Sequence, residues 1–200
     1  MLLRYNNSRK RFLLLRASRG SIMFEFFKLG MEHIITGYDH LLFLFALLLA
    51  RQSFKSYLAI ITSFTIAHSI TLTLGALGYI NLPSLLVESV IALSICYVAI
   101  ENIVRKEVKT RWVLTFIFGL IHGLGFAGLI GGMNLPTSNF ILTLLSFNLG
   151  IEVVQIALVA IIVPILNKMQ HTSIYPKTQL TASAIITLIG GYWVVERLFM

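Results

Sequence analysis

Charged residues are scarce in this 200-residue chain. Asp, Glu, Lys and Arg together make up 12% of it, against roughly 25% in an ordinary soluble domain. Hydrophobic residues make up 57%, and the mean hydropathy is +0.86. The composition therefore excludes a soluble globular protein and predicts an integral membrane protein of one domain.

Cysteine is nearly absent as well. Cys96 is the one cysteine, so neither an intrachain disulfide nor a CxxC metal site can form. The sequence also lacks a nucleotide-binding motif, which argues against ATP coupling within the chain. The formal net charge is +8, but nucleic acid explains it poorly. Most basic residues after position 19 lie in short connections between apolar runs, where they fix the orientation of a membrane protein.

Long apolar runs are what the chain has in abundance. A helix needs roughly 20 apolar residues to cross the hydrocarbon core, and only a helix satisfies its own backbone there. Six runs meet this requirement, which predicts an all-α, polytopic membrane helical bundle. The predicted spans are 33–50, 57–79, 84–103, 112–131, 139–166 and 180–199.

The connections between these runs differ sharply in charge. Connections 51–56, 104–111 and 167–179 contain Lys and Arg, whereas connections 80–83 and 132–138 contain neither. The positive-inside rule therefore places the three basic connections on the cytoplasmic side of the membrane. We expect that membrane to be a bacterial inner membrane.

The basic N-terminal segment does not fit this orientation. Six of the sixteen Lys and Arg of the chain lie in the first 19 residues. The apolar stretch in residues 1–22 is too short for the core of a signal peptide. We interpret 1–22 as a tail that is not native, with Met23 as the start and 23–200 as a single transmembrane domain. Residues 23–32 would then form a short interfacial helix with Phe24, Phe26 and Phe27 among the headgroups.

Ionisable side chains inside the spans are the functional candidates. Each costs about 2.5–3.5 kcal/mol in the bilayer, so it is expected to face the bundle interior. At about 1.5 Å per residue, the imidazoles and carboxylates of several spans lie in the outer half, at depths that one site could share. The candidates are Asp39, His40, His68, Glu88, His122 and Glu152, with Asn148 as a polar neighbour.

Spacing adds direction to these positions. His33, Gly37 and His40 share one helical face, from which Asp39 points about 100° away toward a neighbouring helix. A weak internal repeat, FTIAHS and FGLIHG, places His68 and His122 at equivalent depths. The fifth span carries one polar stripe, and the fourth carries a ridge of small residues that lets another backbone approach. The stripe is Asn148, Glu152 and Gln155, and the ridge is Gly119, Gly123 and Ala127.

Three neutral imidazoles with a carboxylate suit Ni²⁺, Co²⁺ or Zn²⁺ and suit Mg²⁺ or Ca²⁺ badly. We expect His40, His68 and His122 as ligands, Asp39 and Glu152 as carboxylate ligands or their partners, and Asn148 as an oxygen donor. Three further positions have weaker roles: Glu88 near the outer mouth, His33 as a candidate ligand at the interface, and Glu101, which is expected to be solvated and paired. The plain alternative is that these histidines only join helices, at about 0.6 kcal/mol each.

Five stretches resemble the HupE/UreJ family of hydrogenase and urease accessory membrane proteins. They are HIITGYDHLLFLFALLL, FTIAHSITL, VESVIALSICYVAIEN, FGLIHGLGFAG and FNLGIEVVQ, which span most of residues 33–155 and leave 1–22 outside. The resemblance implies a small inner-membrane protein of a family regarded as nickel permeases. Its characteristic positions here are His33, Asp39, His40, His68, Glu88, Glu101, Asn102, His122, Asn148 and Glu152.

The sequence therefore predicts a divalent-metal permease whose substrate is nickel, with cobalt or zinc as alternatives. Its expected partners are the metal ion and the lipid bilayer, with metalloenzyme maturation proteins or further copies of the chain as additional candidates. A rival interpretation is an intramembrane zinc hydrolase that uses three histidines, Asp39 and the Ser69 hydroxyl. A third is a non-catalytic accessory subunit of the membrane.

Overall fold

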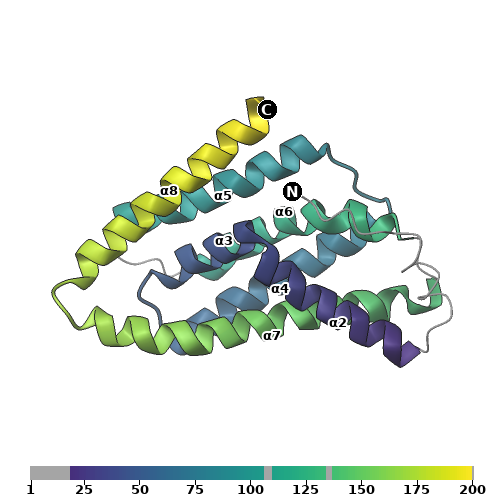
Figure 1. The fold of residues 1–200 in the computed structure, drawn as a ribbon, viewed down its shortest axis with the longest axis horizontal. Coiled ribbons are helices and arrows are strands. Elements are labelled where there is room, and N and C mark those ends of the chain that lie inside the picture. The colour runs from purple at the N-terminus through teal and green to yellow at the C-terminus, as the bar shows by residue number, and fades with distance from the viewer. Residues whose placement is uncertain (1–18, 106–109, 134–136, 200) are drawn as a thin grey trace.

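The computed structural model describes residues 19–105, 110–133 and 137–199, and within them the chain forms seven helices and no strand. The predicted all-helical bundle is confirmed. The helices, shown in Figure 1, are α2 Arg19–Thr36, α3 Tyr38–Leu48, α4 Phe54–Ala76, α5 Ser84–Val104, α6 Arg111–Gly131, α7 Thr137–Gln170 and α8 Tyr175–Phe199. Residues 1–18 of the predicted tail lie outside the described residues.

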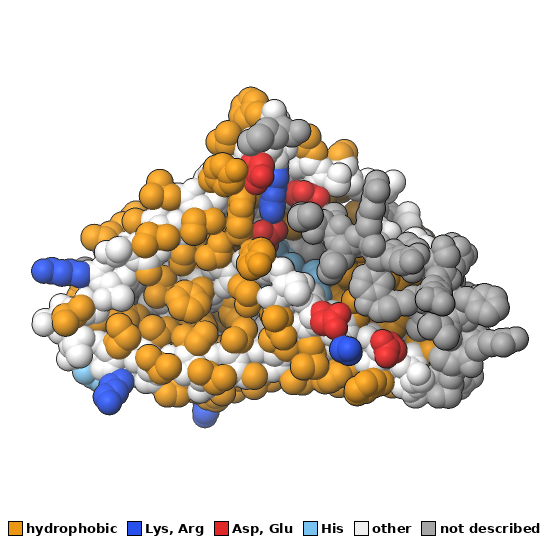
Figure 2. All heavy atoms as spheres, viewed as in Figure 1, with side chains coloured by type: hydrophobic (Ala, Val, Ile, Leu, Met, Phe, Trp, Pro, Cys, Tyr) orange, Lys and Arg blue, Asp and Glu red, His pale blue; other side chains and the backbone are white. Residues whose placement is uncertain are grey.

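Five helices are long and apolar enough to cross a membrane, namely α4, α5, α6, α7 from Phe140 onward, and α8. They correspond to the last five predicted spans. The predicted connection 167–179 is mostly helical, because α7 continues through Pro164 to Gln170 and α8 begins at Tyr175. Hydrophobic side chains are spread over the described part of the face shown in Figure 2, as lipid contact requires.

The prediction of one continuous span over 33–50 is wrong. The chain breaks at Gly37, whose φ of −82° and ψ of 88° are not helical, and only the 11-residue α3 follows. A Cβ atom at this position would lie 2.6 Å from the His33 carbonyl oxygen and 3.0 Å from His40 Nδ1. Glycine therefore allows the backbone and the His40 ring to crowd together at the break.

Helix α2 is longer and more buried than the predicted interfacial helix. It begins at Arg19, inside the predicted tail, and it buries Ile22 and Phe26. It crosses α7 with the two backbones in contact, because a Cβ on Gly30 would meet the Phe147 carbonyl and one on Gly150 would meet the Phe27 carbonyl. Small residues allow such close crossings between helices.

Two parallel helices, α4 and α6, pack closely along their length. Gly119 of α6 faces Phe64 of α4, and Gly123 faces the backbone of His68, so the predicted small-residue ridge is confirmed as packing. Because His122 precedes Gly123, the prediction that His68 and His122 lie at equivalent depths is also confirmed.

The described residues that flank or form the three basic connections lie at one end of the bundle, on the left in Figure 1. Arg51 donates to the Gln170 carbonyl across 2.7 Å, which joins the first connection to the third. The ends of α4 and α6 and the start of α5 lie at the opposite end. The charge asymmetry of the sequence therefore corresponds to two distinct ends of the structure.

Candidate metal site

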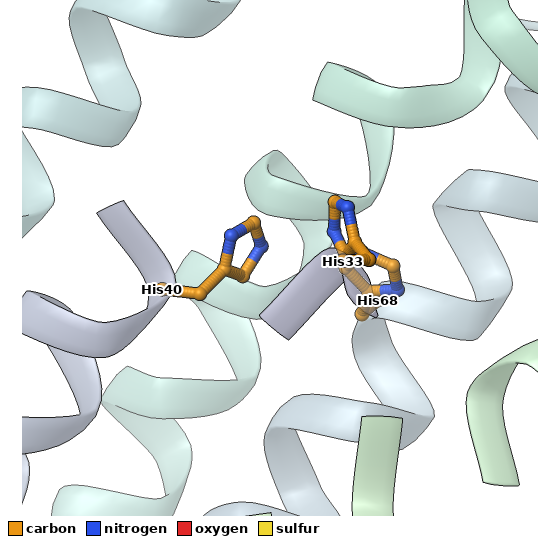
Figure 3. A group of neighbouring side chains, drawn as sticks. All are labelled: His33, His40 and His68. Atoms are coloured by element: carbon orange, nitrogen blue, oxygen red, sulfur yellow. The ribbon is translucent and has the colours of Figure 1, made fainter. Parts of the chain in front are cut away.

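Three histidines from three helices meet inside the bundle. His33 comes from the end of α2, His40 from the first turn of α3, and His68 from the middle of α4. One ring nitrogen of each can be chosen so that all three lie within 4.8 Å of one another. The ring centroids of His33 and His40 are 4.6 Å apart, and Figure 3 shows the His40 ring directed toward the other two. This spacing is compatible with a shared cation after small side-chain movements.

His122 of α6 adjoins the group through His40, with ring centroids 5.3 Å apart. It does not belong to the three whose nitrogens lie within 4.8 Å. His33, predicted as a candidate ligand at the membrane interface, lies within this group of imidazoles. The break at Gly37 turns α2 so that His33 packs against His40 and against Phe126, whose ring centroid is 4.3 Å away.

The Nε2 atoms of all four histidines are buried and have no hydrogen-bond partner among the described residues. Buried polar atoms are ordinarily hydrogen-bonded, so four such atoms in one place are exceptional. His122 Nδ1 lies 2.8 Å from the Phe118 carbonyl oxygen, which can only accept a hydrogen bond. We assign the proton of neutral His122 to Nδ1 for that reason. The Nε2 atom then carries an unprotonated lone pair that could bind a cation.

Asn148 of α7 orients His68 in the same way. Its Nδ2 donates to the Leu144 carbonyl across 2.8 Å, so its Oδ1 faces His68 Nδ1 at 3.3 Å and accepts a hydrogen bond from it. The Nε2 lone pair of His68 is then also free. The structure thus gives Asn148, predicted as an oxygen donor to the metal, a hydrogen bond that orients the His68 ring.

Aromatic rings surround the imidazoles. Phe43 lies 4.8 Å from His122 and Phe64 lies 5.9 Å from His68, measured between ring centroids. His68 and His122 are 0% and 1% exposed. Histidine surface is nevertheless visible near the middle of the face in Figure 2, beside acidic and basic side chains. Aromatic rings therefore line the imidazoles, and part of the histidine surface reaches this face of the molecule.

The predicted carboxylates lie around the imidazoles and are not members of that group. Asp39 Oδ2 accepts a hydrogen bond from Arg197 of α8 at 2.8 Å, so Asp39 does meet a neighbouring helix, as predicted. Glu152 Oε1 accepts from Thr62 of α4 at 2.9 Å. Glu88 is half-buried on α5, and its backbone carbonyl accepts from Arg197. In the described part of the chain, the group within 4.8 Å contains imidazoles alone.

The polar stripe predicted on the fifth span faces α4. Its three side chains each meet an α4 side chain, in the pairs His68–Asn148, Thr65–Gln155 and Thr62–Glu152. These pairs continue from the imidazoles toward the basic end of the bundle. Thr62 and Thr65 were not predicted, because threonine is common in apolar helices and carries little signal by itself.

Arg197, which pairs with Asp39, was also not predicted as a residue near the site. It is an arginine at the end of a predicted span whose neighbouring connections at that end lack Lys and Arg. That departure from the charge pattern is the signal that would have identified it.

Comparison with known proteins supports the resemblance seen in the motifs. The family model described as HupE / UreJ protein matches residues 9–197. The match therefore includes residues 9–22, which the motif comparison had left outside. No curated protein and no solved structure matches the chain significantly. The chain belongs to the HupE/UreJ family, which is associated with nickel or cobalt transport or accessory functions, and it is a multi-pass membrane protein.

Proposed function

We propose that the protein is a permease for a divalent transition-metal ion, with nickel as the first candidate and cobalt and zinc as alternatives. The observation that supports it best is a set of four buried Nε2 atoms that have no hydrogen-bond partner in the described part of the chain, from His33, His40, His68 and His122. Neutral imidazole is a good ligand for these borderline ions and a poor one for Mg²⁺ or Ca²⁺.

The hydrogen bonds around the site favour transport over hydrolysis. Asp39, which a zinc hydrolase of this kind would use, is paired with Arg197, and the Ser69 hydroxyl donates to the Thr65 carbonyl at 2.6 Å. The polar pairs between α4 and α7 offer instead a line of oxygen atoms from the imidazoles toward the basic end. If that end is cytoplasmic in a bacterial inner membrane, the ion moves inward along this line.

Proteoliposomes that contain the purified chain test the proposal. We expect influx of Ni²⁺, Co²⁺ or Zn²⁺ well above that of Mg²⁺, and we expect the double variant His68→Ala, His122→Ala to lose it. Equal influx in the wild type and the double variant would refute the permease. Tightly bound stoichiometric zinc with hydrolytic turnover and no influx would indicate the hydrolase, and co-purification of a partner without either would indicate an accessory subunit.

Influx should depend on pH in one direction. A proton and a metal ion compete for the same imidazole lone pair, so the metal-free state holds more protons than the loaded state. We therefore expect influx to fall as the pH drops below about 6.5, where imidazole ordinarily gains a proton. Initial rates between about pH 5.5 and 8 would check this. A rate that rises toward acid pH would contradict ligation by neutral imidazole.

Asn148 offers a test of ligand positioning. Asn148→Leu removes the acceptor for His68 Nδ1, and loss of such a supporting hydrogen bond typically weakens metal binding about 10–100-fold. We expect a loss of that size in a Co²⁺ titration of the purified protein. Asn148→Asp is the matched control, because it retains an acceptor oxygen and should bind within a few-fold of the wild type. Unchanged affinity in Asn148→Leu would remove this role.

A further inference from the structure

Arg197 is held at the edge of the candidate metal site by three different groups. Its Nη2 atom donates to Asp39 Oδ2 of α3 across 2.8 Å, and its Nη1 atom donates to the Glu88 carbonyl of α5 across 2.6 Å. The guanidinium carbon lies 5.7 Å from the centroid of the Trp193 ring. The Arg197 and Asp39 side chains are 17% and 27% exposed, so the ion pair is largely shielded from water.

The carboxylate of this ion pair lies next in sequence to a candidate metal ligand. Asp39 precedes His40 in the first turn of α3, so a ligand and a carboxylate are carried by adjacent residues of one short helix. A carboxylate carried next to a candidate imidazole ligand would be expected to attract a divalent cation. In the described residues it is already neutralised by a cation that belongs to the protein.

We propose that Arg197 is a tethered cation that neutralises Asp39 while the imidazoles are free of metal and leaves the carboxylate when a divalent ion binds. The inference rests on the proposed function and adds a residue to it. A 2+ ion among neutral imidazoles brings positive charge close to the guanidinium and competes with it for Asp39. The Glu88 carbonyl and Trp193 can retain the guanidinium nearby, so the exchange does not require α8 to unfold.

This exchange has a consequence for transport. A carboxylate that binds the metal without competition would hold it more tightly and release it more slowly. The returning guanidinium lowers the affinity and helps the ion to leave, as a transport site requires. Removal of the positive charge at position 197 should therefore lower KM and kcat for influx together, which loss of a purely structural clamp would not do.

Co²⁺ binding to the detergent-purified full chain, followed by its visible absorption, tests the proposal. We expect Arg197→Gln, which can still donate a hydrogen bond, to lower the Kd for Co²⁺ about tenfold or more. Arg197→Lys retains the charge and should remain near the wild type. The double variant Asp39→Asn, Arg197→Gln should lose the gain. Arg105→Gln is the control for charge, because Arg105 is exposed at the basic end and pairs with Glu101.

Each outcome bears on the proposal. An unchanged or weaker Kd in folded Arg197→Gln, with His68-dependent binding in the wild type, overturns the role of Arg197 and leaves the metal site standing. Absence of His68-dependent binding in the wild type overturns both. If Arg197→Gln does not fold, Asp39→Asn decides. The exchange requires this variant to weaken Co²⁺ binding, because it removes the carboxylate and leaves the Arg197 charge in place, and a Kd equal to that of the wild type would overturn the exchange.

Discussion

Replacing His40 with alanine is expected to reduce metal influx at least about 100-fold, because loss of even a supporting group near a metal typically weakens binding about 10–100-fold. His40 occupies the centre of the site. Its ring centroid lies 4.6 Å from that of His33, 5.3 Å from that of His122 and 6.2 Å from that of His68. The other histidines lack one or more of these neighbours, so no other single substitution should disrupt the site as much.

Initial rates of Ni²⁺ influx into proteoliposomes would measure this effect. His171→Ala is the matched control, since His171 is exposed between α7 and α8, away from the four imidazoles, and its loss should leave influx within about twofold. Equal elution from a sizing column would show that both variants fold. Influx in His40→Ala comparable to that of His171→Ala would mean that the imidazoles only pack the bundle.

The fold could be predicted from the sequence wherever one physical rule decided the outcome. A long apolar run must be helical in a bilayer, and this requirement located α4 to α8. It could not locate the break at Gly37, because the residues on both sides of Gly37 are apolar enough to continue a helix. Helix α2, which precedes the break, packs against α7 at Gly30 and Gly150, and no local pattern carries such a long-range contact.

The site was predictable to a similar extent. Counting depth along straight helices brought His40, His68 and His122 to one level, and the structure does bring His40 near both. The same counting put His33 at the interface, because it assumed that residues 33–50 form one straight helix. Metal binding by the four histidines stays a prediction, which the influx of the His40→Ala variant tests.

Two charged residues near the end of α3, Glu101 and Arg111, are more buried than the sequence predicted. Glu101 was expected to be paired and solvated, and the pairing is confirmed with Arg105 and Arg111. The solvation is wrong, because Glu101 is 7% exposed and Arg111 is 1% exposed. Arg111 was counted with a basic connection, but it turns inward and donates to the Leu47 carbonyl across 3.5 Å.

Side chains from four helices cap the final carbonyls of α3. Asn102 donates to Ala46, Arg111 to Leu47, Tyr57 to Leu48 and Ala50, and Tyr175 to Leu49. The last carbonyls of a helix have no partner within it, and a cation near them is stabilising. Arg111 thus serves this cap and the ion pair with Glu101 at once, which explains why an arginine is tolerated inside the bundle.

Replacing Glu101 with alanine is expected to lower the free energy of unfolding by about 3–5 kcal/mol, because it leaves the buried Arg111 guanidinium without its carboxylate. For a chain of this size, that loss corresponds to a drop in Tm on the order of 10 °C. Thermal unfolding of the detergent-purified protein would measure it.

Two controls separate the buried ion pair from the loss of charge. Arg105→Ala removes the exposed partner of Glu101. Because the Arg105 side chain is 62% exposed, this change should lower the free energy of unfolding by about 0–1 kcal/mol. The double variant Glu101→Leu, Arg111→Met removes both buried charges and should recover much of the loss, since apolar replacement of a whole buried pair is often neutral. If Glu101→Ala unfolds at the same temperature as Arg105→Ala, the Arg111 guanidinium must reach water, and the buried cap on α3 cannot be as tight as the hydrogen bonds indicate.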